Sequence, residues 1–339
     1  VAAYDLVGLQ TQTDVGNLMG CLVAMCGAVA EAGRLRIGRR QTQVQAFPIG
    51  IDVESFRKLA AASVRSATTP LKATRQSLGE RKLVVGVDRL DYSKGIVQRL
   101  EAFGHFLRSH PDQRGRVGLL QIAPPSRSDV PEYAELDRQS DEVAGRLNAA
   151  LGEFDWTPIR MVKKAYSRNA LAGFYRRAQV GLVTPMRDGM NLVAKEYVAA
   201  QDPADPGVLV LSRFAGAAHQ MGEALIVNPY DIHEVAEAIR TALAMPQSER
   251  IRRFEKLYDT IASTDIGWWT RNYLAALSGA ALSTPEIVPF PAKPVEAGQP
   301  RKGRRSAAQK SRPVQTASER KVRLVGLRGG AAAQSQPHD

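Results

Sequence analysis

The sequence predicts an α/β fold built on a doubly wound, mostly parallel sheet. Short apolar runs rich in β-branched residues alternate with longer amphipathic segments over most of the 339 residues. Four such strand–helix units follow one another directly from residue 83 onward, which is typical of a parallel sheet covered by helices. The apolar content of 44% is ordinary for a globular protein. No apolar run reaches the roughly 18 residues that a membrane-spanning helix requires.

The first 70 residues are expected to hold short elements of one domain. A strand is predicted at 6–10, and the apolar helix after it extends to about Ala30, with Asp14 as its cap. A second strand is predicted at 44–48, and a short helix begins at 51–53. A polar helical stretch at 60–80 follows, and the domain boundary is expected near Thr69 and Pro70.

The second domain is predicted for residues 71–265 and carries the regular alternation. Its strands are expected at 83–87, 117–122, 159–162, 180–184, 208–211 and 225–227. Its helices are expected at 96–110, 133–151, 169–177, 192–200 and 232–244, followed by a charged helix at 248–261. A last helix, from Gly267 to Leu277, lies in a segment (266–282) that ends before a tail at 283–339.

The stretch from Thr184 to Gln201 has the pattern of a ligand-binding strand–turn–helix unit. A β-rich run ends at Thr184, a turn follows at 187–189, and a helical pattern starts near Met190. Free N–H groups at a helix start favour anions, and the glycine of the turn lets a ligand approach the backbone. Asp188 at the helix start and Glu196 about two turns further along would suit a sugar attached to a diphosphate. An ordinary capped helix with a solvated glutamate would give the same pattern.

A second strand–loop–helix unit places two cations at a strand's carboxyl end. Arg89 and Lys94 follow the buried strand at 83–87 and precede the helix at 96–110. Arginine binds phosphate as a planar fork and lysine as a point charge, so the pair suits a diphosphate. Surface cations are common, but open α/β sheets bind their ligands at this end of the strands.

These motifs together closely resemble the trehalose-6-phosphate synthases, which are retaining glycosyltransferases with two Rossmann-like domains (the GT-B architecture). The resemblance covers about residues 4–277 and rests on the segments 87–95, 121–127, 184–201, 209–216 and 228–231. It implies transfer of glucose from UDP-glucose to glucose 6-phosphate, which gives α,α-trehalose 6-phosphate. It implies no metal or other cofactor.

The resemblance also implies a role for each site residue. Arg89 and Lys94 would neutralise the leaving diphosphate and Asp188 would hold the donor sugar, which makes these three the expected catalytic residues. Arg127 would bind the phosphate of the acceptor. Further donor contacts are expected from Tyr166 at the base, from the helix start at Gly189, Met190, Asn191, Leu192, Val193, Ala194 and Lys195, and from Glu196 at the ribose.

The first residues resemble a strand deep inside the family's first domain. Most of that domain, with the acceptor contacts and a histidine near the donor, would then lie upstream, so the chain is expected to be a fragment with little activity by itself. Two alternatives stay open: a glucosylglycerol-phosphate synthase, which shares the donor half, and a noncatalytic or regulatory fragment of the same family.

The remaining candidates for chemistry give weaker signals. Cys21 and Cys26 are five residues apart on a helical pattern, and buried reduced thiols are expected there rather than a disulfide or a metal site. Reduced thiols fit a cytoplasmic protein. The five histidines show no spacing typical of a metal site or a catalytic triad, and none is expected to be catalytic.

The net charge of +12 is concentrated at the carboxyl end. Residues 279–339 hold eleven of the 46 Lys and Arg but only four of the 34 Asp and Glu. This composition cannot bury enough apolar surface to fold alone, so a solvated, disordered tail is favoured over contact with a polyanion or an acidic membrane. The proposed chemistry needs neither nucleic acid nor a membrane, and a homo-oligomer is left open.

Overall fold

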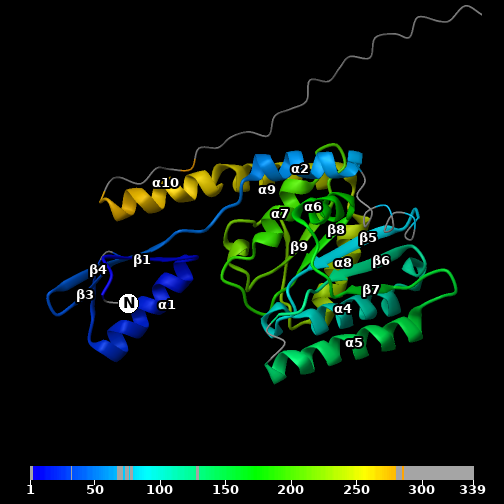
Figure 1. Ribbon diagram of the computed structural model, residues 1–339, viewed down its shortest axis with the longest axis horizontal. Coiled ribbons are helices and arrows are strands. Elements are labelled where there is room, and N and C mark those ends of the chain that lie inside the picture. The colour runs from blue at the N-terminus through cyan, green and yellow to red at the C-terminus, as the bar shows by residue number, and fades with distance from the viewer. Residues whose placement is uncertain are drawn as a thin grey trace, which may run out of the picture. The chain divides into compact units, whose positions relative to one another are not determined.

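A computed structural model describes residues 3–31, 33–66, 79–126 and 130–279, together with the single positions 72, 76 and 285. Two sheets carry the fold within these residues: a four-stranded sheet of order β1-β4-β3-β2 and a six-stranded sheet of order β10-β9-β8-β5-β6-β7 (Figure 1). The described residues up to 279 belong to one compact unit. The expected boundary at 69–70, Arg127 and, apart from Pro285, the expected tail at 283–339 lie outside the described residues.

The six-stranded sheet is parallel throughout. It consists of β5 (Lys82–Val87), β6 (Val117–Ile122), β7 (Ile159–Val162), β8 (Val180–Val183), β9 (Val208–Ser212) and β10 (Leu225–Val227). The chain adds β6 and β7 on one side of β5, then returns to add β8, β9 and β10 on the other side. The strand order therefore reverses between β5 and β8, and open α/β sheets bind ligands at such a point.

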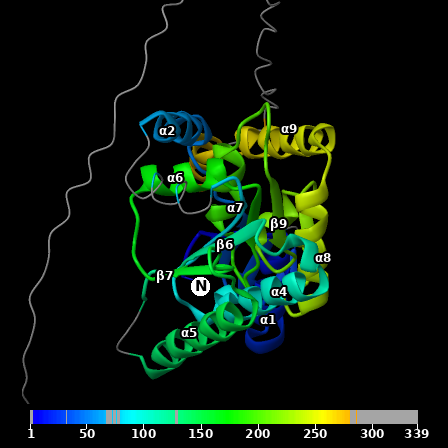
Figure 2. The ribbon, with the colours of Figure 1, turned by 90° about the vertical axis from the view of Figure 1, so that its right-hand side faces the viewer.

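Helices cover both faces of this sheet, as the doubly wound prediction requires (Figure 2). One face carries α4 (Ile96–Ser109), α5 (Pro131–Leu151) and α8 (Ile232–Ala244). The other carries α2 (Val53–Ser66), α6 (Arg168–Arg177), α7 (Leu192–Ala200) and α9 (Gln247–Ser263). The strands are apolar on both sides because each side packs against a helix layer. All predicted strands and helices from residue 83 onward are confirmed, with bounds within two residues.

The four-stranded sheet is less regular. It contains β1 (Leu6–Leu9), β2 (Val29–Glu31), β3 (Arg34–Ile37) and β4 (Arg40–Ala46), and only the β1–β4 pairing is parallel. Strands β2 and β3 were not predicted, because β2 has only three residues and β3 is a four-residue alternation of arginines with Leu35 and Ile37. Helix α1 (Gln12–Cys26) ends earlier than predicted, because Gly27 takes a left-handed conformation (φ 59°) that terminates it.

Two local predictions for α1 are wrong. Thr11, not Asp14, is the N-cap: its Oγ1 accepts a hydrogen bond from the Asp14 N–H (3.1 Å) and donates one to the Asp14 carboxylate (2.7 Å). Cys21 and Cys26 are free but exposed rather than buried. Cys21 lies away from the side of α1 that packs on its sheet through Val15, Leu18, Met19 and Leu22, and Cys26 is the last residue of the helix, before the Gly27 cap.

The segment from Phe47 to Ile51 leads from β4 to α2 and is held by contacts with helix α10 near the end of the described chain. Helix α10 (Ile266–Leu277) places Tyr273 edge-to-face on Phe47, with ring centroids 5.1 Å apart, and the Trp269 indole donates a hydrogen bond to the Phe47 carbonyl. The Ile266 N–H donates to the Ile51 carbonyl. Among the described helices, none is long and apolar enough to cross a membrane.

Candidate active site

A cavity of about 630 Å³ opens at the carboxyl ends of β5 and β8, where the strand order reverses. The loop after β5 contributes cations and the start of α7 contributes backbone N–H groups. Eight of the predicted site residues line this cavity: Arg89, Lys94, Asp188, Met190, Asn191, Leu192, Val193 and Glu196. Its wall is completed by Gln10, Ile49, Val87, Asp88, Pro124, Leu171 and Tyr175. The cavity thus combines two cations, a helix start and two predicted carboxylates.

Lys94 and Asp188 form an ion pair at the centre of this arrangement. Lys94 Nζ lies 2.6 Å from Asp188 Oδ2, and the two side chains are only 15% and 17% exposed. Asn191 Nδ2 donates a second hydrogen bond to the same carboxylate oxygen at 3.0 Å. The Met186 N–H donates to the Ser93 carbonyl, which ties the two loops together. Both sides of the cavity are therefore fixed relative to one another before a ligand binds.

A buried ion pair between Arg99 and Asp88 contacts the backbone of Lys94. Arg99, on α4, donates to Asp88 Oδ2 at 2.7 Å, and both side chains are almost completely buried. Arg99 also donates to Gln121 Oε1, Thr184 Oγ1 and the Lys94 carbonyl. Burial raises the pKa of Asp88, while the Arg99 charge opposes this effect. This network joins the ends of β5, β6 and β8 to the loop that carries Lys94.

The start of α7 is set by an unusual backbone conformation. Asn191 has φ +73°, and no other described residue except glycine has a positive φ. Its Oδ1 accepts from the Ala194 N–H at 3.3 Å, which caps the helix. The first N–H groups of a helix have no partner within it, so those of Leu192 and Val193, which line the cavity, point to an anion subsite. Backbone strain of this kind is often found at ligand sites.

Two consecutive residues of α7, Lys195 and Glu196, have different surroundings. Glu196 lines the cavity, and burial raises its pKa although the charge of Arg168 opposes this. Lys195 lies 1% exposed on another side of the helix, where its Nζ donates to the Ile49 carbonyl and to Gln220 Oε1, both at 2.8 Å. Burial without a carboxylate partner lowers the pKa of Lys195 to about 8.

Some predicted site residues are not brought into this cavity. Lys195 and Ala194 do not line it, and the Ala194 N–H is already bonded to Asn191. Tyr166 also lies outside the lining and packs edge-to-face on Phe174, with ring centroids 5.4 Å apart. Their predicted roles, like that of Arg127, remain predictions.

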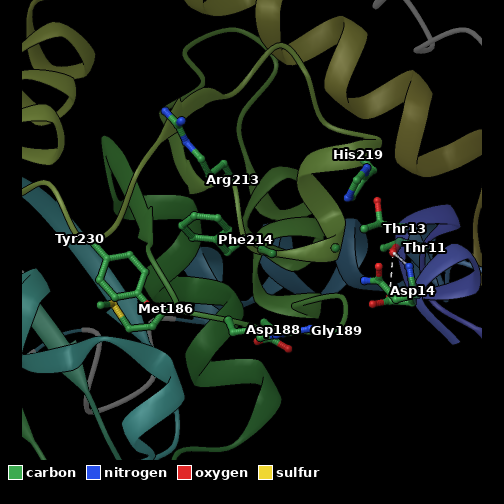
Figure 3. Close-up of a pocket in the computed structure, with 14 residues that line it drawn as sticks. Thr11, Thr13, Asp14, Met186, Asp188, Gly189, Arg213, Phe214, His219 and Tyr230 are labelled. Atoms are coloured by element: carbon green, nitrogen blue, oxygen red, sulfur yellow. Dashed lines mark hydrogen bonds between the residues drawn. The ribbon is translucent and has the colours of Figure 1, made fainter. Parts of the chain in front are cut away.

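A second cavity, of about 520 Å³, adjoins the first through Asp188 (Figure 3). Gly189 lines it, together with the aromatic pair Phe214 and Tyr230. The rest of its lining is Thr11, Thr13, Asp14, Asn17, Met186, Arg187, Arg213, Ala215, Gly216 and His219. Asp188 therefore lines both the cavity with Arg89 and Lys94 and a second cavity that combines hydroxyl groups with two further arginines. Apart from Asp188 and Gly189, this lining was not predicted, because its members come from segments about 200 residues apart in the sequence.

The polar groups of the two cavities suit a ligand that carries both negative charge and hydroxyl groups. Among the described residues, no group of three or more His, Cys, Asp and Glu side chains could hold a metal ion. The first cavity has the charges to bind a diphosphate, and the neighbouring hydroxyl and carboxylate groups can bind a polyol. This combination matches the chemical parts of a nucleotide sugar.

Comparison with known proteins gives a consistent result. The family described as "Glycosyltransferase family 20" matches residues 1–279. The chain is 49% identical over 279 residues to a trehalose-6-phosphate synthase of Sinorhizobium fredii, covering 82% of this chain and 60% of that protein. It is 41% identical over 284 residues to one of Salmonella typhimurium, covering 84% of this chain and 59% of that protein.

Solved structures agree with these sequences. An α,α-trehalose-phosphate synthase (UDP-forming) from Burkholderia vietnamiensis superposes with a TM-score of 0.80 at 46% identity, over 82% of this chain and 59% of that one. One from Burkholderia xenovorans in complex with glucose-6-phosphate has a TM-score of 0.80 at 44% identity, over 82% and 62%. An E. coli structure described as bound with UDP-2-fluoro glucose has a TM-score of 0.78 at 40% identity, over 83% and 62%. The chain spans about three fifths of the length of these relatives.

Proposed function

Because the chain belongs to glycosyltransferase family 20, we propose that it carries the donor site of an α,α-trehalose-phosphate synthase (UDP-forming). The reaction would transfer glucose from UDP-glucose to glucose 6-phosphate and keep the configuration of the anomeric carbon. Relatives that are 41–49% identical are named trehalose-6-phosphate synthases, and solved structures that are 44–46% identical are described as UDP-forming. One of these structures is described in complex with glucose-6-phosphate, and another relative is described as bound with UDP-2-fluoro glucose. The α/β architecture of the chain agrees with that of these GT-B enzymes.

One observation carries the proposal: Arg89, Lys94, Asp188 and Glu196 meet with the start of α7 around a single cavity. A departing diphosphate gains negative charge, and cations held in place before the reaction stabilise it without reorganisation. Arg89, Lys94 and the N–H groups of α7 are the groups that would do this. Asp188, adjacent to Lys94, would hold hydroxyl groups of the sugar, and Glu196 would accept hydrogen bonds from the ribose.

The donor sugar would react on the face from which the diphosphate departs. Retaining glycosidases use two carboxylates about 5 Å apart, one of which attacks the sugar. Here Asp188 is already bonded to Lys94 and Asn191, which suits a binding group better than a nucleophile. We therefore assign to the chain the tasks of holding the sugar and neutralising the diphosphate, while the diphosphate itself would assist the incoming hydroxyl.

The remaining parts of the proposal concern the acceptor and the cell compartment. Arg127, which follows the cavity residue Pro124 three positions later in the sequence, would bind the phosphate of glucose 6-phosphate. A cytoplasmic location is supported by the two free, exposed cysteines, because thiols stay reduced there.

Donor binding is the direct test, since the chain spans about three fifths of its relatives' length. Titration calorimetry with UDP-glucose, ADP-glucose and GDP-glucose would measure affinity and nucleotide preference on the whole 339-residue chain. Saturable, one-site binding of UDP-glucose is expected. A folded chain that binds none of the three nucleotide sugars would contradict the proposal.

A further inference from the structure

A buried hydroxyl in the wall of the donor cavity has no partner. Tyr175, on α6, lines the cavity but is only 1% exposed, and its hydroxyl makes no hydrogen bond to any described group. Its ring is fixed between Phe56 of α2 and Tyr197 of α7, with centroid distances of 6.3 and 6.4 Å. A buried hydroxyl without a partner is costly and uncommon, so its retention calls for an explanation.

Two carboxylates, Glu196 and Asp88, line the same cavity as Tyr175 and are the candidate partners of its hydroxyl. Burial is the main cause that raises the pKa of Tyr175 well above its usual value, and the carboxylates of Glu196 and Asp88 add to it, in that order. The phenol therefore stays protonated and can donate its O–H to a carboxylate. Asp88 already accepts from Arg99. Glu196 lines the same cavity, and burial and the Arg168 charge account for its pKa, with no hydrogen bond from a described group.

We propose that Tyr175 is a positioning residue whose hydroxyl donates to the Glu196 carboxylate when a nucleotide sugar is bound. The second carboxylate oxygen would then face the vicinal hydroxyl groups of the ribose. This inference rests on the proposed function, because it takes Glu196 as the ribose-binding group. It explains why a tyrosine with an unpaired hydroxyl lies at this place in the cavity wall.

The charged groups around Glu196 determine how its ionisation, and with it the binding of a nucleotide sugar, would depend on pH. Arg168 of α6 favours its ionised form, while Arg89, Lys94 and Asp88 line the same cavity. A hydrogen bond from Tyr175 would stabilise ionised Glu196 further and lower its pKa. Removal of the hydroxyl would raise that pKa, so binding that needs the carboxylate would be lost at a higher pH.

Tyr197 provides a matched control. It is also 1% exposed, and its ring contacts Tyr175 directly. Its hydroxyl differs in having a partner, since it donates to the Ala178 carbonyl at 3.1 Å. Tyr197 is not in the cavity lining. The substitutions Tyr175→Phe and Tyr197→Phe each remove one buried hydroxyl. Only Tyr197→Phe also removes a hydrogen bond that is present in the structure.

The experiment measures the affinity for UDP-glucose from about pH 5 to about pH 8.5, together with the melting temperature. UDP-glucose is chosen because its diphosphate carries no proton that titrates in this range. For Tyr175→Phe we expect affinity at pH 7 to fall about five- to tenfold, the size of one lost hydrogen bond. The acid midpoint of binding should move to higher pH, and the melting temperature should not fall. For Tyr197→Phe we expect a melting temperature about 2–4 °C lower, with unchanged affinity and midpoint.

The other outcomes would overturn the inference. Unchanged affinity and midpoint in Tyr175→Phe would show that the hydroxyl has no role in binding. Weaker binding with an unmoved midpoint would mean that it contacts the nucleotide sugar directly and not through Glu196. If the unsubstituted chain bound no UDP-glucose, the proposed function would fail together with this inference. If the unsubstituted chain and Tyr175→Phe bound UDP-glucose equally well at every pH, only the inference would be rejected.

Discussion

Lys94 Nζ lies 2.6 Å from Asp188 Oδ2, and this ion pair joins the loop that follows β5 to the loop that follows β8. The pair is mostly shielded from solvent, so the attraction is stronger than that of an exposed ion pair. A nucleotide sugar that enters the cavity would meet the cation and the carboxylate side by side. The cation would then face the diphosphate while the carboxylate faces the sugar hydroxyls.

Lys94→Ala should weaken binding of UDP-glucose about 10- to 100-fold. The substitution removes a cation that we expect to contact the diphosphate, and a charge-assisted hydrogen bond contributes about 1.5–3 kcal/mol. Titration calorimetry at fixed ionic strength would measure the change. Lys58→Ala is the matched control, because Lys58 is 72% exposed and pairs only with Glu54 on α2. Equal affinities for the two variants would remove Lys94 from the donor site.

Arg99→Leu should destabilise the fold by about 3–5 kcal/mol, because it leaves Asp88 buried without its charged partner. Urea unfolding would measure this, and Arg108→Leu on the same helix is a suitable control, since Arg108 is exposed. The double variant Arg99→Leu with Asp88→Leu should recover part of the lost stability. A loss below about 1 kcal/mol in the single variant would show that Asp88 is readily accommodated without Arg99.

Lys195 should make stability rise with pH in the alkaline range. Burial lowers the pKa of Lys195 in the folded chain to about 8 from its usual 10.5, so between these values the unfolded chain binds more protons. The penalty is fully present below about pH 8 and is relieved as pH rises toward about 10.5, by about 3 kcal/mol in all. The measurement is the free energy of unfolding from about pH 7 to about pH 10 in the unsubstituted chain and in Lys195→Met. A difference between the two that does not change with pH would contradict the lowered pKa.

Most of the second sheet and part of the site could be predicted because their signals are local. The start of α7 and the cations at Arg89 and Lys94 follow directly from strand–turn–helix patterns. The interactions of Arg99 and Lys195 could not be predicted, since a single cation in an amphipathic helix gives no indication of burial. Their partners Gln121 and Ile49 are 22 and 146 residues away in sequence, and only the folded chain brings them together.

The exposure of Cys21 and Cys26 was mispredicted for a related reason. An apolar helix such as α1 predicts burial on every side, whereas the structure covers only one side of it. The sequence also gives no sign that the Tyr175 hydroxyl lacks a hydrogen-bond partner. Tyr197 is a tyrosine of the same burial, yet its hydroxyl has a partner.

Gly50→Ala should be strongly destabilising, because the segment between the two sheets passes too close to the start of α10 for a side chain. A Cβ at Gly50 would lie 2.3 Å from the Thr264 carbonyl oxygen and 2.5 Å from the Asp265 carbonyl carbon. These are backbone atoms that cannot rotate away, so the segment must shift and strain the hydrogen bond between Ile266 and Ile51. Thermal unfolding should show a melting temperature lower by several degrees, since overpacking of this kind costs about 1–3 kcal/mol. Gly20→Ala in α1 is the matched control: no atom lies within 4 Å of its Cβ, and alanine favours a helix by up to about 1 kcal/mol, so stability should hold or rise. If both variants melted at the same temperature as the unsubstituted chain, the close approach at Gly50 would not restrict the fold.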